Sequence, residues 1–163
     1  KEAPDDVFLV SETGGTIKCA KALRVETDYS LTEAPQIDVL LVPGGQGTRR
    51  EVENQALLDW IAARAEGCTW VTSVCTGALL LHEAGPARGK RITTHWAFVE
   101  ALRKRGDATV LEKVRYVRDG NLVTAAGVAA GQAVQKGSFH PGCQVHRLWF
   151  PGEQMERVRF DHV

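Results

Sequence analysis

The chain has 163 residues, of which 44% are hydrophobic and 25% are charged, and its formal net charge is zero. This length and composition predict one globular domain over residues 1–163 and exclude two ordinary domains. The neutral charge argues against a nucleic-acid partner. Because no apolar run reaches the length of a membrane span and no signal-peptide pattern is present, we expect a cytoplasmic protein without a membrane partner.

The first elements in chain order are predicted to be short strands. Residues 7–10 are apolar, residues 12–15 supply turn residues, and residues 16–20 can return as a strand, which predicts a hairpin or a strand with a short return. Residues 37–42 are almost all apolar and then stop at Pro43-Gly44-Gly45. A short apolar run that ends in this way is typical of a strand buried on both faces, and hence of a parallel sheet.

The chain then alternates strands with helices up to residue 134. Further strands are predicted over residues 69–74, 91–94, 114–117 and 122–125. Helices are predicted from the N-cap Asn54 to a C′ glycine at Gly67, over residues 77–84 and 96–105, and over residues 127–134. Asp119-Gly120 is a type I′ hairpin signal. Residues 135–163 form an atypical tail to which no element is assigned.

This alternation predicts an α/β fold with a mostly parallel sheet flanked by helices. In such sheets the ligand site lies beyond the carboxyl ends of the strands. The candidate site residues are therefore sought where predicted strands end.

Cys75 is the main candidate, because Ser73-Val74-Cys75-Thr76-Gly77 lies where a buried strand meets a helix. The layout is that of a nucleophile elbow with cysteine as the nucleophile. Small residues at 73 and 77 leave room for the tight turn, which is expected to strain the backbone of Cys75. The helix N-terminus favours the thiolate, and the amide of Thr76 is placed to stabilise an oxyanion. The alternative is a buried structural cysteine.

Two further features are expected at the same edge of the sheet. Gly44 and Gly45 follow the neighbouring strand and can turn their N–H groups toward a bound oxygen, although an ordinary turn has the same residues. His95 ends another strand and opens a helix, where it can orient or deprotonate the thiol, or only cap the helix. Three such features at the ends of three successive strands are more informative than any one.

The other candidates are weaker. The four cysteines form no C-x-x-C pair and no zinc-ligand spacing, so we predict no metal and no cofactor. Cys19 and Cys68 are expected to be structural, and His82 to pack or to face solvent. The tryptophans expected in the core are Trp60, Trp70 and Trp96.

Four segments, in order, carry a resemblance to a known family. They are residues 42–45 (VPGG), 71–77 (VTSVCTG), 89–96 (GKRITTHW) and 117–124 (VRDGNLVT). The set resembles the ThiJ/PfpI superfamily, and within it most of all the isonitrile hydratase-like branch. It is also similar to the ligand-sensing half of AraC-type regulators. The resemblance implies a flavodoxin-like, class I glutamine amidotransferase-like fold, which is a three-layer sandwich.

The resemblance also implies roles for single residues. Cys75 corresponds to the reactive cysteine of the family. Gly45 and Thr76 correspond to positions whose backbone amides line the anion pocket, and Thr76 also to a threonine that matters for catalysis in isonitrile hydratases. His95 corresponds to a histidine near the cysteine in the deglycase branch.

The chain departs from the family pattern at both ends. We expect it to lack the family's first strand and helix, and neither Glu12 nor Asp38 fits the motif of the acidic residue that hydrogen-bonds the family's cysteine. Residues 135–163 stand where the family continues into a long apolar helix. A parallel sheet without its first strand exposes backbone groups, so either a partner chain fills the gap or the sequence is a part of a longer molecule. The resemblance implies a dimer, and we expect a homodimer.

The leading functional hypothesis is a cysteine-dependent hydratase or hydrolase of a small electrophilic substrate, such as an isonitrile or a reactive carbonyl. Cys75 attacks, the amides of Gly45 and Thr76 hold the developing charge, and a proton donor completes the addition of water. The alternative is a non-catalytic domain that binds a small molecule or registers oxidation at Cys75, as in AraC-type regulators. Peptidase activity is a third option.

Overall fold

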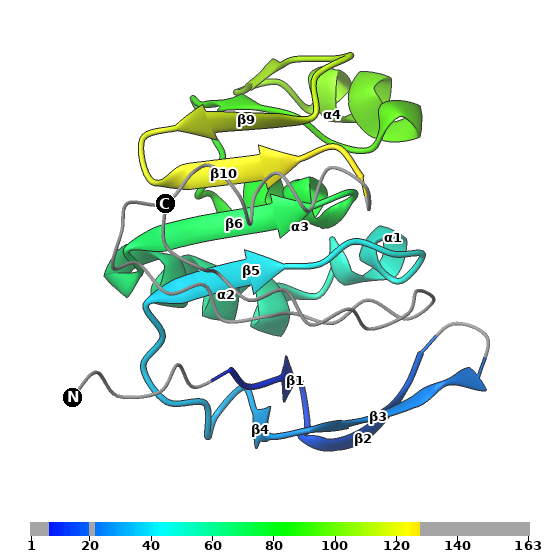
Figure 1. Cartoon of the computed structure of the whole chain (residues 1–163), viewed down its shortest axis with the longest axis vertical. Coiled ribbons are helices and arrows are strands. Elements are labelled where there is room, and N and C mark those ends of the chain that lie inside the picture. Colours follow the sequence, from blue (N-terminus) through cyan, green and yellow to red (C-terminus); the bar gives the residue numbers. More distant parts are fainter. Residues whose placement is uncertain (1–6, 20–21, 128–163) are drawn as a thin grey trace, which may run out of the picture.

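The computed structural model of the chain describes residues 7–19 and 22–127 (Figure 1). Most of the predicted helix over 127–134, and all of the tail over 135–163, lie outside these residues. The strands are β1 (Val10–Ser11), β2 (Gly15–Lys18), β3 (Arg24–Thr27), β4 (Tyr29–Ser30), β5 (Val39–Val42), β6 (Trp70–Val74), β7 (Arg91–Ile92), β8 (Thr109–Val110), β9 (Tyr116–Asp119) and β10 (Leu122–Ala125). The helices are α1 (Thr48–Glu51), α2 (Gln55–Gly67), α3 (Gly77–Ala84), the 3-10 helix η2 (Trp96–Phe98) and α4 (Val99–Arg105).

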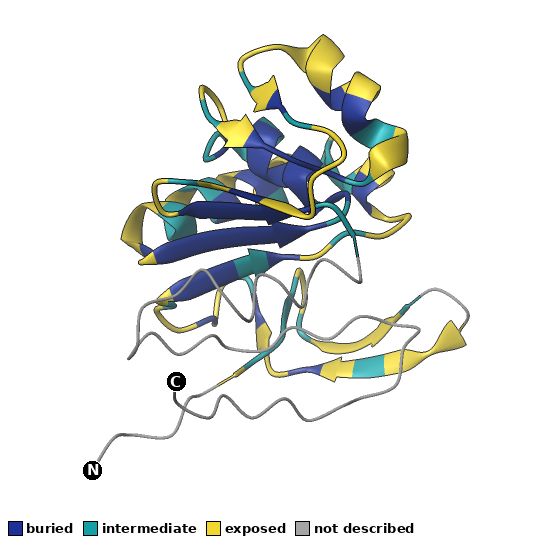
Figure 2. Cartoon of the chain, turned by 45° about the horizontal axis from the view of Figure 1, so that its top comes forward, coloured by how far each residue is buried: buried dark blue, intermediate teal, exposed yellow. Residues whose placement is uncertain are grey.

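A four-stranded sheet with the order β5-β6-β10-β9 forms the centre of the domain. The strands β5, β6 and β10 are parallel, and β9 pairs antiparallel with β10. All five residues of β6 are buried, which is typical of a strand covered on both faces. Figure 1 shows α2 and α3 behind this sheet, and Figure 2 shows its two central strands, β6 and β10, in the dark blue of buried residues. The predicted α/β fold with a mostly parallel sheet flanked by helices is confirmed.

Two hydrophobic clusters cover the two faces of the sheet, because successive strand residues point to opposite sides. The first cluster joins α2, α3 and α4 to one face and includes Leu40, Leu58, Ile61, Val71, Leu79, Leu102 and Leu122. The second consists of the alternate strand residues Val39, Trp70, Val74, Val123 and Ala125. Of the three expected layers, the described residues contain the sheet and the helices of the first face.

Several local signals in the sequence correspond to observed element ends. Asn54 caps α2, and its side chain accepts a hydrogen bond from the N–H of Leu57 at 3.3 Å. Gly85 and Gly106 end α3 and α4 with positive φ values. Gly67 is the last residue of α2 and Cys68 is its C-cap, so the prediction of Gly67 as the C′ residue was off by two positions.

The pairing of the N-terminal strands differs from the prediction. Residues 7–10 and 16–20 do not form a hairpin with each other, because β1 pairs parallel with β4 and β2 pairs antiparallel with β3. Figure 1 shows the β2–β3 ribbon projecting away from the central sheet. The turn residues at 12–15 separate β1 from β2. Each of these two strands pairs with a strand that comes later in the chain, β1 with β4 and β2 with β3.

β7 is not a strand of the central sheet. It pairs with β8 in a separate two-stranded sheet. It meets the central sheet through side chains, since the N–H of Thr93 donates to Thr124 Oγ1 at 2.8 Å and the N–H of Arg91 donates to Asp119 Oδ2 at 2.8 Å. The carboxyl end of β7 therefore still arrives beside the end of β10.

The β9–β10 hairpin was predicted at the right place but with the wrong turn type. Asp119 pairs with Leu122, which leaves Gly120 and Asn121 as a two-residue loop. Only Gly120 of this pair has a positive φ, of 62°. A positive φ at the first loop residue alone is the pattern of a type II′ turn, whereas type I′ requires it at both.

Among the helices that the structure describes, none is long and apolar enough to cross a membrane.

Candidate functional site

The backbone of Cys75 is strained, as the elbow pattern predicts. Cys75 joins β6 to α3 and has a φ of 57°, in the left-handed region that non-glycine residues rarely adopt. Its N–H donates to the carbonyl of Ala125 at 2.8 Å, and its own carbonyl accepts from Thr94 Oγ1 at 3.0 Å. The ends of β10 and β7 thus hold the elbow from one side and leave the thiol half-buried.

Two glycines allow the backbone around the elbow to approach this closely. A Cβ on Gly77 would collide with the carbonyl oxygen of Val42 and lie 2.9 Å from that of Pro43. A Cβ on Gly44 would lie 2.7 Å from the nitrogen of Thr76 and 2.8 Å from Cβ of Cys75. The prediction that only a small residue fits at position 77 is therefore confirmed. Gly44, in the loop after β5, is also required because a side chain there would collide with the elbow.

Ser73, the other small residue of the elbow, is fully buried in β6 between β5 and β10. Its Oγ makes no hydrogen bond.

Hydrogen bonds join the Gly44-Gly45 loop to the start of α3. The N–H of Gly45 donates to Thr76 Oγ1 at 3.0 Å, so it is already engaged within the protein. The Thr48 hydroxyl lies 2.8 Å from the carbonyl oxygen of Gly45 and 3.0 Å from Thr76 Oγ1. Within residues 7–19 and 22–127, the N–H groups of Gly44 and Thr76 make no hydrogen bond, so they are the amides left to bind an oxygen.

We expect Thr76→Val to loosen this loop. The substitution keeps the volume but removes the acceptor of the Gly45 N–H, and such a hydrogen bond contributes about 1 kcal/mol. Hydrogen exchange at the Gly45 amide should therefore become roughly five times faster than in the unsubstituted protein. Thr76→Ser keeps the hydroxyl and should leave this rate close to its original value. Equal rates in both variants would show that the hydroxyl does not hold the loop.

His95 caps the next helix rather than contacting the thiol. Its Nδ1 accepts a hydrogen bond from the N–H of Ala97 at 3.3 Å. In the neutral ring the proton is then on Nε2, which makes this nitrogen a donor and not a base. In the part of the chain that the structure describes, no hydrogen bond joins His95 to Cys75. His95 nevertheless follows Thr94 directly in the chain, and the Thr94 hydroxyl donates to the carbonyl of Cys75.

Aromatic side chains surround His95 at this edge. Its ring centroid lies 5.3 Å from that of Trp96 and 6.4 Å from that of Phe98. The guanidinium of Arg49, the second residue of α1, lies over the Phe98 ring at 5.0 Å from its centroid. The prediction that Trp96 lies in the core was wrong, because 81% of this residue is exposed.

The remaining sequence candidates lie elsewhere. Burial raises the pKa of the Cys68 thiol, whose Sγ donates to the carbonyl of Ile37 at 3.3 Å, as expected of a structural cysteine. His82 is buried, with Nε2 at 2.8 Å from the carbonyl oxygen of Gly106. Glu12 is exposed and accepts from Asn54, and Asp38 is exposed at the opposite end of β5 from the elbow.

Two threonines at the site were missed from the sequence. The Thr48 hydroxyl forms a hydrogen bond with Thr76 Oγ1, and the Thr94 hydroxyl donates to the carbonyl of Cys75. Together these bonds fix the backbone that carries the thiol. Both threonines follow strand ends at the predicted edge, so their position was an available signal. Threonine is too common in such turns for that position alone to select them.

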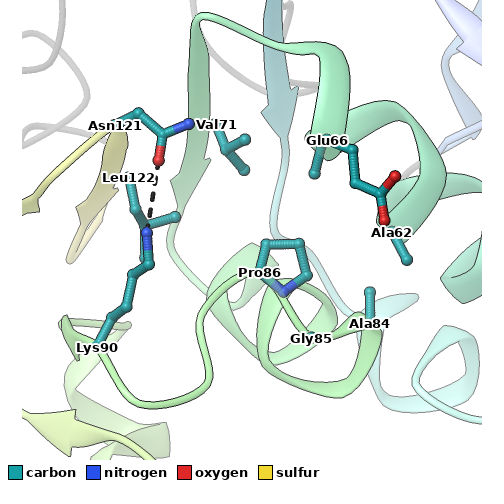
Figure 3. Close-up of a pocket in the computed structure, with 10 residues that line it drawn as sticks. Ala62, Glu66, Val71, Ala84, Gly85, Pro86, Lys90, Asn121 and Leu122 are labelled. Atoms are coloured by element: carbon teal, nitrogen blue, oxygen red, sulfur yellow. Dashed lines mark hydrogen bonds between the residues drawn. The ribbon is translucent and has the colours of Figure 1, made fainter.

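A pocket of about 370 Å³ lies at the other end of the sheet (Figure 3). Its lining includes Val71 and Leu122, the start of two central strands, and Lys90, whose Nζ lies 3.4 Å from Asn121 Oδ1. No predicted site residue lines it. Among residues 7–19 and 22–127, no group of three or more His, Cys, Asp or Glu side chains is suited to hold a metal ion.

Comparison with known proteins shows what the chain is similar to. The sequence profile described as the DJ-1/PfpI family matches residues 1–136. Isonitrile hydratase of Pseudomonas putida is 40% identical over 129 residues, which are 78% of this chain and 56% of that protein. The HTH-type transcriptional regulator CdhR of Pseudomonas aeruginosa is 27% identical over 122 residues, which are 75% of this chain and 36% of the regulator.

A solved structure agrees with these sequence matches. The crystal structure of a THiJ/PfpI family protein from Pseudomonas syringae superposes with a TM-score of 0.72 and 31% identity, and the match covers 78% of this chain and 53% of that one. The chain thus spans about half the length of this protein and of the isonitrile hydratase.

Proposed function

Because the chain belongs to the DJ-1/PfpI family, we propose that it is a cysteine-dependent hydratase or hydrolase of a small electrophile, with an isonitrile as the leading substrate class. The observation that carries the proposal is the strained backbone of Cys75 at the start of α3. Such a turn presents the thiol beyond the carboxyl ends of the parallel strands, where α/β proteins bind ligands. The 40% identity to an isonitrile hydratase supports this choice of chemistry.

The reaction would proceed in two steps through a covalent intermediate. The Cys75 thiolate adds to the terminal carbon of the isonitrile and that carbon takes a proton, which gives a thioimidate, R–N=CH–S–Cys75. Water then adds to the same carbon while the nitrogen takes a proton. The carbon–sulfur bond breaks, the N-substituted formamide leaves, and Cys75 regains its thiol.

Two groups near Cys75 support this sequence of steps. The N–H groups of Gly44 and Thr76, which make no hydrogen bond among the described residues, lie next to Cys75 in space or in the chain and would stabilise the oxygen that water introduces. Gly45, which the sequence suggested for this role, would instead hold the loop through Thr76. The Nε2–H of His95, whose Nδ1 is engaged by Ala97, would donate a hydrogen bond to the bound substrate, and the protons that the carbon and the nitrogen take would come from water.

A second candidate function is a non-catalytic sensor of a small molecule. The observation that favours it is the match to the regulator CdhR, which covers 36% of that protein. A sensor would bind its ligand at Cys75 but would not need turnover. The two functions therefore differ in whether product forms.

Turnover by the purified chain tests the proposal. We expect an alkyl isonitrile to be converted to its formamide, followed by proton NMR, at a rate proportional to enzyme concentration. Methylglyoxal, measured in parallel, tests the reactive-carbonyl option. Binding of either compound without any product would reject the enzyme and favour the sensor.

A further inference from the structure

Trp96 is the most exposed large hydrophobic residue among those described, with 81% of its surface accessible. A tryptophan buries the most apolar surface of any side chain, so one left in solvent is unusual and often belongs to a binding site. Trp96 is also next in the chain to His95 and two residues from Thr94, which bonds to Cys75. The exposed ring therefore belongs to the edge of the sheet where the thiol lies.

The aromatic group around Trp96 is held in place by contacts on both sides. The His95 ring, tilted by 35° to that of Trp96, is fixed by the N–H of Ala97. Phe98 is covered by the guanidinium of Arg49, and α1, which carries Arg49, is tied to the elbow through Thr48. The loops after β5 and β7 thus contact each other through Arg49 and Phe98, and a ring presented by such a fixed loop is ready to receive a ligand.

An isonitrile also needs recognition of this kind. The reacting group R–N≡C has no N–H or O–H to donate, and its terminal carbon must remain free for Cys75. Selectivity among isonitriles therefore depends on contacts with the substituent R. Apolar substituents are bound by flat aromatic surfaces through the loss of exposed area.

We propose that Trp96 is a specificity-determining residue that packs against the apolar substituent of the electrophile bound at Cys75. The site then prefers substrates with an aromatic or bulky apolar group over small polar ones. This inference rests on the proposed function of Cys75, and it adds the substrate class that the site selects.

The test compares two alkylating probes of Cys75, iodoacetamide and N-benzyl iodoacetamide, in the full chain. Each rate constant is measured by mass spectrometry of the peptide that contains Cys75. We expect the benzyl probe to react faster, and Trp96→Ala to lower the ratio of the two rates by about tenfold, the effect of losing one aromatic packing surface. Trp96→Phe should keep most of the ratio. Tyr29→Ala, which removes another exposed aromatic ring from β4, should keep all of it.

Four outcomes contradict the inference and can be told apart. An unchanged ratio in Trp96→Ala, with Cys75 still reactive, overturns the role of Trp96 and leaves the proposed function intact. An equal loss of both rates shows that Trp96 only supports the structure. Failure of Cys75 to react with either probe in the unsubstituted protein overturns the proposed function, and the inference with it. An unchanged ratio together with a shift in oligomeric state would assign Trp96 to an interface.

Discussion

Cys75→Ser should lower kcat/KM for isonitrile hydration at least about a thousandfold, because the seryl hydroxyl is not ionised at neutral pH and is a far weaker nucleophile than a thiolate. The structure shows no hydrogen bond from His95 to residue 75 that would activate a hydroxyl. The product to measure is the formamide, at several substrate concentrations, so that kcat and KM are separated. A fall in kcat with little change in KM is expected for a lost nucleophile.

The matched control for this variant is Cys68→Ser. Cys68 is buried and donates to the Ile37 carbonyl, a bond that a serine hydroxyl can also make. This variant should keep its activity, and its circular dichroism should match that of Cys75→Ser. If Cys75→Ser retains more than about a tenth of the activity, the nucleophile hypothesis is wrong, since loss of a true nucleophile is far more severe.

Gly77→Ala should destabilise the protein by about 3 kcal/mol or prevent folding, the upper range for an inserted methyl group in a packed interior. The new Cβ would collide with the carbonyl oxygen of Val42 and lie 2.9 Å from that of Pro43, and these are backbone atoms that cannot rotate away. To accept the methyl group, α3 would have to move off the end of β5. The free energy of unfolding, measured by urea titration, gives the size of the effect.

Gly67→Ala is the control for this glycine. Gly67 ends α2 with no atom within 4 Å of the position of an added Cβ, and its φ is not positive. This substitution should be neutral or stabilise the protein by up to about 1 kcal/mol, because alanine favours a helix. Similar unfolding free energies for the two variants would contradict the close approach of β5 and α3.

The elements that carry Cys75 were predictable because their signals are local. An apolar run closed by glycine is enough to predict β5 and β6, and Asn54 and Gly85 mark helix ends through their own backbone bonds and conformation. The strained φ of Cys75 was also predictable, since small residues at 73 and 77 are what such a turn needs.

Other features depend on residues distant in the sequence and were not predictable. Which strand pairs with β1 or β2 depends on the arrangement of the whole N-terminal region, and turn residues do not encode it. Trp96 was expected in the core because tryptophan is usually buried, but its position at the end of the β7 loop leaves it in solvent. The engagement of the Gly45 N–H depends on Thr76, which is 31 residues away.

The sequence by itself determined the fold class, the family and the turn that presents Cys75, because each rests on short-range patterns of apolar, small and capping residues. Only the tertiary structure decided which groups surround the thiol. In the described part of the chain, the N–H of Gly45 is engaged by Thr76, the N–H groups of Gly44 and Thr76 make no hydrogen bond, His95 accepts from Ala97, and Trp96 is exposed. The physical reason is that hydrogen bonds and burial are settled by which chain segments meet in space, and those contacts form between residues far apart in the sequence.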